Sequence, residues 1–139
     1  MRNAIICATG SGRLAIELRW VREVITLAHV TPVPTAPAVI LGVTHLGGGI
    51  VPVIDAQPAA DGLRRRARAG DSAVVIESGE ARAAVWVSAV KEVITLRESG
   101  GAVTDARGGA VVMVSGSDLL ARATQAVSLA AGIGVDGGP

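Results

Sequence analysis

A seven-residue segment occurs twice in the chain, and this repeat constrains the fold more than any other feature. Residues 21–27 return as residues 90–96 with six of seven identical, at an offset of 69 residues. The same register also matches Ala4 with Ala73, Gly10 with Gly79, Arg13 with Arg82 and Ala15 with Ala84. Because this offset is half of the 139-residue chain, we infer two copies of one structural unit.

Both copies begin with a predicted β-hairpin. In the first copy, the apolar run 5–7 leads into the turn 9–12, and apolar residues then alternate with others to residue 18. The second copy repeats this arrangement with residues 74–76 and 77–80 and a strand that ends near residue 87. Such alternation is typical of strands with one buried face. The repeated segment then predicts a bend that leads into another strand.

The two copies match again further on, at an offset of 60 residues. Residues 48–55 align with residues 108–115, so Asp55 and Ser115 are predicted to cap a helix start with their side chains. A C-terminal helix over residues 116–131 is predicted by its apolar stripe of Leu119, Leu120, Ala123, Val127 and Ala130. One or two helical turns are predicted over residues 35–42, and Pro52 is expected at an edge or turned away from a neighbouring strand.

These patterns predict an all-β chain with short helical turns and one C-terminal helix. The core must be built from small aliphatic side chains, because half of the residues are hydrophobic but only 1% are aromatic. Two such small halves need one another's apolar faces, so we expect a single domain over residues 1–139 with a shared core. On that basis Val24→Asp or Val93→Asp is expected to unfold the whole domain at once.

Charge and cysteine content exclude several classes of protein. A net charge of +1 and the scarcity of aromatic residues argue against a nucleic-acid partner. The single cysteine excludes a disulfide scaffold, and no signal-peptide pattern is present, so we expect a cytoplasmic protein. Residues 24–54 carry no charge, but Pro32, Pro34, Pro37 and Pro52 interrupt them, which argues against membrane insertion and favours strands, turns and an interface.

No residue pattern in the sequence predicts catalysis or a cofactor. Cys7, His29 and His45 lack the paired spacing of a metal site. The glycines around residues 10 and 47–49 fit hairpin turns better than a phosphate loop. The arginine-rich run 64–68 is expected to be a solvated linker between the halves, with anion or nucleic-acid binding as the less favoured alternative. We therefore expect a binding or assembly module that is not an enzyme.

Three motifs together resemble the CheW-like domain family. They are Val-Arg-Glu-Val at 21–24, Pro-Val-Pro at 32–34, and Gly-Val-Thr-His-Leu-Gly-Gly-Gly-Ile-Val-Pro-Val-Ile-Asp at 42–55. The match is dense from residue 5 to about residue 56, moderate over 73–96 and weaker over 108–120. Their order and spacing are those of the family.

The resemblance implies two SH3-like, five-stranded β-barrel subdomains. The first would cover about residues 15–75, and the second about residues 76–120 together with the N-terminal strand. It also implies a non-catalytic adaptor of chemotaxis-type signalling. Such an adaptor joins the cytoplasmic tip of a methyl-accepting chemoreceptor to the regulatory domain of the histidine kinase CheA.

By resemblance, the receptor-binding side would include Val21, Glu23, Val43, His45 and Gly47. The chain departs from the family pattern here: His45 replaces an asparagine and Gly47 replaces an arginine, so the charge pairing with Glu23 is expected to be lost. Ala56 replaces a leucine, and the stretch after residue 96 is shortened. The alternative is a CheW-like scaffold or regulatory module of another two-component pathway that no longer binds receptors in the usual way.

Overall fold

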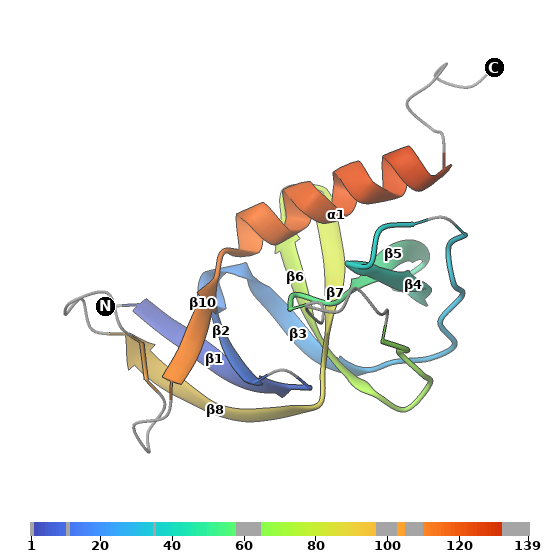
Figure 1. Ribbon diagram of the computed structural model, residues 1–139. Coiled ribbons are helices and arrows are strands. Elements are labelled where there is room, and N and C mark those ends of the chain that lie inside the picture. Colours follow the sequence, from blue (N-terminus) through green and yellow to red (C-terminus); the bar gives the residue numbers. More distant parts are fainter. Residues whose placement is uncertain are drawn as a thin grey trace.

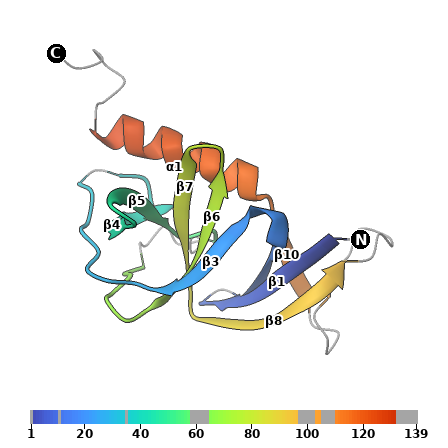
Figure 2. The ribbon, with the colours of Figure 1, turned by 180° about the vertical axis from the view of Figure 1, so that it is seen from behind.

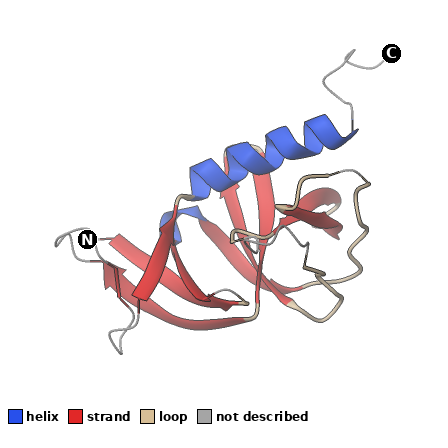
Figure 3. Cartoon of the chain, viewed as in Figure 1, coloured by secondary structure: helices blue, strands red, loops and turns tan. Residues whose placement is uncertain are grey.

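The computed structural model describes residues 2–10, 12–34, 36–57, 65–96, 103–104 and 110–131. Its strands are β1 (Arg2–Thr9), β2 (Gly12–Glu17), β3 (Val21–Thr26), β4 (Ile40–Leu46), β5 (Gly49–Ile54), β6 (Ser72–Ser78), β7 (Ala81–Val87), β8 (Ala89–Leu96), β9 (Val103–Thr104) and β10 (Ala110–Val114). A short 3-10 helix, η1 (Leu18–Trp20), and one α-helix, α1 (Gly116–Ala131), accompany them. Strands thus dominate the chain, which confirms the predicted class (Figure 3).

The strands form two five-stranded sheets. One has the order β8-β1-β2-β10-β9, and the other has the order β3-β6-β7-β5-β4. In Figure 1 the first sheet lies at the lower left and the second at the right, with α1 running across the top; Figure 2 shows the same arrangement from behind. The predicted hairpins are confirmed as β1–β2 and β6–β7.

Each sheet combines strands from both sequence repeats. The hairpin β1–β2 of the first copy pairs with β8 and β10 of the second, whereas the hairpin β6–β7 of the second copy pairs with β3 and β5 of the first. The pairings are equivalent: Val24 faces Val74 in one sheet, and Val93 faces Ile5 in the other. The two copies are therefore interlocked, because neither sheet can form from one copy alone.

A shared core lies between the two hairpins. The largest buried cluster takes Ile5 and Ile16 from the first hairpin and Val74 and Val85 from the second, each less than 5% exposed. Leu119 and Leu120 of α1 close this cluster on one side. Burying aliphatic side chains of this size stabilises the fold by about 1.5–3 kcal/mol each. The expectation of one core shared by both halves is confirmed.

Each sheet also covers a smaller cluster on its other face. In the first sheet this cluster is built on Ala4, Ile6 and Ala15, and in the second it contains the equivalent alanines, Ala73 and Ala84. The repeat therefore places the same small residues at the same places in both halves. The second cluster also holds Leu27, Leu41, Val51 and Val53, but both clusters contain fewer buried side chains than the shared core and contribute less to stability.

The C-terminal helix begins as predicted. The Ser115 hydroxyl accepts a hydrogen bond from the Asp118 amide at 3.3 Å, which caps the helix N-terminus. Gly116 follows directly, and a Cβ at this position would collide with the Trp20 ring, 2.5 Å from Cγ. Glycine is thus required where the helix start packs on η1.

Two expectations about local structure are corrected, and a third falls largely outside the described residues. The described part of residues 35–42 holds turns and the start of β4, with an Ile40 amide bonded to the Pro37 carbonyl, and forms no helix. Val24 and Val93 are 48% and 58% exposed, because β3 and β8 are the outer strands of their sheets as far as the structure describes them. The shortened stretch after residue 96 lies outside the described residues, apart from β9.

Because Val24 and Val93 are exposed, a substitution of a buried valine is the better test of the shared core. We expect Val74→Asp to unfold both sheets together, because it places a charge in the cluster that joins the hairpins. Val24→Asp on the neighbouring outer strand should cost about 1 kcal/mol or less, since its side chain is half exposed. Far-UV circular dichroism and urea titration measure both variants. A Val74→Asp protein that keeps half of its β signal would contradict the shared core.

Candidate functional site

The receptor-side residues expected from the sequence lie on the two outer strands of one sheet. Val21 and Glu23 belong to β3 at one edge, and Val43 and His45 belong to β4 at the other. Gly47 is in the turn that joins β4 to β5. Glu23, His45 and Gly47 are exposed, and Val21 and Val43 are partly buried. The structure thus places all five within one sheet but on strands that are not direct neighbours.

The chain that leaves β3 links these two edges. Past Leu27 it turns back along β4, where the Thr31 amide and carbonyl bond to the Val43 carbonyl and amide, both at 2.8 Å. The Thr44 hydroxyl also donates to the His29 carbonyl at 2.9 Å. Gly42 permits this approach, since a Cβ there would be 2.6 Å from the Thr31 carbonyl oxygen. Val43 therefore offers no free main-chain groups for a partner strand.

This pairing also explains how Pro52 is tolerated. Pro52 faces Val43 across the β4–β5 ladder, but both main-chain groups of Val43 are used by Thr31 on the other side. The missing N–H of Pro52 therefore leaves no acceptor on Val43 without a partner. Pro52 is thus not at an edge, because β5 lies between β4 and β7, but its missing N–H is turned away from β4.

The β4–β5 turn requires glycine. Gly47 has φ +56° and Gly48 has φ +81°, values typical of a two-residue hairpin turn and rarely adopted by residues with side chains. The prediction that residues 47–49 form a hairpin turn is confirmed. Without side chains on this turn, the surface around it is shaped by residues from neighbouring strands.

An arginine from β7 lies at this turn, and the sequence reading did not identify it. The Arg82 guanidinium places Nη1 3.6 Å from where a Cβ of residue 47 would be, and Nη2 3.2 Å from where a Cβ of residue 49 would be. A cation is thus present at the turn even though Gly47 replaces the family's arginine. The signal was weak: Arg82 matches Arg13 in the repeat, but only the parallel pairing of β5 with β7 brings it to this turn.

An ion pair lies beside Arg82 in the same sheet. Glu77 faces Arg82 across the β6–β7 ladder, but its carboxylate binds Arg22 of β3, with Oε2 2.6 Å from Nη1. The hydrogen bond to Glu77 and its charge raise the pKa of Arg22, which keeps this arginine charged. The Arg22 side chain is 50% exposed and that of Glu77 is 35% exposed, so the pair adds little to the stability of the fold.

The arginine-rich run is partly structural, which corrects the expectation of a solvated linker. Arg65 is directed inward and binds the buried Asp55 carboxylate through two nitrogens, at 2.8 and 2.9 Å. Its guanidinium also donates to the Gln57 carbonyl and lies 5.3 Å from the centre of the Trp86 ring. Asp55 accepts the Gln57 amide at 3.0 Å, so it caps a turn rather than a helix within the described residues.

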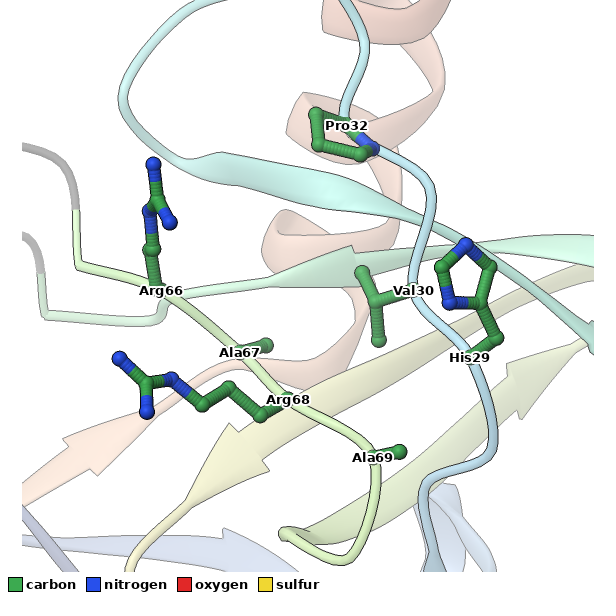
Figure 4. Close-up of a pocket in the computed structure, with 7 residues that line it drawn as sticks. All are labelled: His29, Val30, Pro32, Arg66, Ala67, Arg68 and Ala69. Atoms are coloured by element: carbon green, nitrogen blue, oxygen red, sulfur yellow. The ribbon is translucent and has the colours of Figure 1, made fainter.

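Arg66 and Arg68, in contrast, line a hollow of about 670 Å³, together with His29, Val30 and Pro32. Both arginines are exposed. Figure 4 shows their guanidinium groups directed away from the His29 imidazole. The two guanidinium groups and the imidazole therefore do not converge on one ligand position.

Reactive and metal-binding groups are sparse in the part of the chain that the structure describes. No three His, Cys, Asp or Glu side chains come together there as a possible metal site. Burial raises the pKa of the Cys7 thiol to about 11, so this thiol stays protonated and packs as an apolar group. Within the same ranges, no helix is long and apolar enough to cross a bilayer.

Comparisons with known proteins agree with this architecture. The family model described as CheW-like domain matches residues 3–123. The chain belongs to the CheW-like domain family. It is 26% identical over 98 residues to a chemotaxis protein CheW of Rhizobium meliloti (strain 1021), an alignment that covers 70% of this chain and 63% of that relative.

A solved structure shares the fold. The scaffolding protein TtCheW from Thermoanaerobacter tengcongensis superposes with a TM-score of 0.64, over 81% of this chain and 82% of that one, at 21% identity. This likeness supports the expected pair of SH3-like units in a CheW-like domain. The expected receptor-side residues, all between residues 21 and 47, lie within the family match.

The inward-facing Arg65 should be essential for stability. Arg65→Ala leaves the Asp55 carboxylate, only 2% exposed, without its cation, and we expect the free energy of unfolding to fall by about 3 kcal/mol. Arg66→Ala is the matched control, because its side chain is exposed, and should change stability by about 0.5 kcal/mol or less. Urea unfolding measures both. Equal effects of the two substitutions would show that the Asp55–Arg65 pair is not structural.

Proposed function

We propose that this chain is a non-catalytic adaptor that couples chemoreceptors to the histidine kinase CheA by protein-protein interaction, in the cytoplasm. The observation that carries this proposal is the family match over residues 3–123, combined with relatives named as a chemotaxis protein and a scaffolding protein. The fold supports this proposal, because its buried apolar side chains pack into the core while its sheet edges and turns are exposed to solvent and can contact partner proteins. Chemotaxis is favoured over another two-component pathway because both named relatives are CheW proteins.

The proposed receptor side consists of Val21, Glu23, Val43, His45 and Gly47. The exposed Glu23 supplies a charge at one edge, and the exposed His45 and the glycine turn supply polar and open surface at the other. A helical receptor tip that lies across this sheet would contact side chains from several strands at once. Transient signalling contacts of this kind bury about 800 Å² per partner or less.

Direct binding tests the proposal. The purified chain should bind a chemoreceptor cytoplasmic fragment, and separately the regulatory domain of CheA, from its own genome, as measured by isothermal titration calorimetry. Glu23→Lys should weaken receptor binding about tenfold and leave kinase binding unchanged. The matched control is Glu92→Lys, which changes the equivalent residue of the second repeat.

Two results would contradict the proposal. If the wild-type chain binds neither partner, the adaptor function is wrong. If Glu23→Lys and Glu92→Lys weaken receptor binding equally, the receptor side is not at β3.

A further inference from the structure

Arg82 is a cation without an ion-pair partner among the residues that the structure describes. It is partly buried on β7, and it forms no hydrogen bond or ion pair with another described residue. Glu77, which faces it across the ladder, is already bound to Arg22. A guanidinium that has lost part of its hydration without gaining a carboxylate is suited to binding an acid from another molecule.

The glycine turn leaves this guanidinium accessible. Residues 47, 48 and 49 carry no side chains, and Arg82 lies over the places where the Cβ atoms of residues 47 and 49 would be. No side chain of the turn itself can therefore cover or neutralise Arg82.

An apolar surface adjoins Arg82. A hollow of about 340 Å³ is lined by Arg82 together with Ile50, Val51, Pro52, Glu80, Ala81 and Thr124. Ile50 is 63% exposed, the most exposed of the large hydrophobic side chains in the described part of the chain. A partner that brings an apolar side chain next to a carboxylate would fit both features.

We propose that Arg82 is a specificity residue of the receptor side, which binds a carboxylate on a receptor helix while an apolar residue of that helix covers Ile50. This inference rests on the adaptor function proposed above. A helix can present the two groups together, because residues three or four positions apart lie on one face. Arg82 then supplies, from β7, the cation that Gly47 cannot supply from the turn.

The charge of Glu80 should affect receptor binding in the opposite direction to the charge of Arg82. It lines the same hollow from the β6–β7 turn, is exposed, and forms no ion pair with Arg82. Its carboxylate repels an acidic helix that approaches Arg82. Removing this charge should therefore strengthen receptor binding, whereas removing the charge of Arg82 should weaken it.

The experiment measures the affinity of the full chain for the receptor fragment and for the CheA regulatory domain by calorimetry. Arg82→Glu should weaken receptor binding about tenfold or more and leave kinase binding within about twofold. Arg82→Lys should retain part of the affinity, because lysine keeps the charge but not the planar fork. Glu80→Gln should strengthen receptor binding about twofold, and the gain should shrink at high salt.

Arg66→Glu is the matched control, an exposed arginine at a different hollow that should leave receptor binding unchanged. If the wild-type chain binds the receptor and Arg82→Glu binds it equally well, this inference is overturned and the adaptor function stands. If the wild-type chain does not bind the receptor, the adaptor function itself fails. If Arg82→Glu does not fold, Arg82→Lys and Glu80→Gln still test the inference, because it predicts weaker receptor binding for the first and stronger binding for the second. A Glu80→Gln chain with unchanged or weaker receptor affinity would count against the inference.

Discussion

The packing of two β-hairpins against each other is the interaction on which the rest of this structure depends. The hairpins β1–β2 and β6–β7 are equivalent parts of the sequence repeat, and their apolar faces form the largest buried cluster. The clusters on the far sides of the sheets contain fewer buried residues than this one. A half of about 70 residues with so small a core of its own would be marginal. The exchange of strands between the copies then makes each half depend on the other.

This arrangement also determines which residues are left for partners. The central strands of both sheets are used by the core, so the surface available for recognition consists of the outer strands, their turns and the side chains that reach them. Arg22 and Glu23 on β3, His45 on β4 and Arg82 beside the glycine turn all lie at such places. Most of this surface is solvated, so it is available to the partners proposed above.

The sequence alone was informative where a signal is local or repeated. The offset of 69 residues identified the hairpins, and Ser115 with Asp118 identified the helix start, because turns and caps depend on a few neighbouring residues. The sequence alone was misleading where pairing between residues far apart in the chain determines the structure. Val24 and Val93 have the pattern of core residues but lie on outer strands. Ile40 and Leu41, which were predicted to lie in a helical turn, belong to strand β4.

The candidate site shows the same limit. Local sequence does not distinguish Arg65 from the neighbouring arginines, and it does not mark Arg82. Their surroundings come from residues ten or more positions away: Asp55 for the first, and the turn at Gly47 for the second.

Native-state hydrogen exchange tests the central claim, that the two halves are one interlocked unit, most directly. Amides of Ile5 and Ile16 in one sheet, and of Val74 and Val85 in the other, should exchange with one common free energy of opening that equals the global free energy of unfolding. The opening free energies of these four amides should also fall with denaturant concentration along one common slope. If one sheet opens at a distinctly lower free energy while the other stays protected, the halves are separable units and the account is wrong.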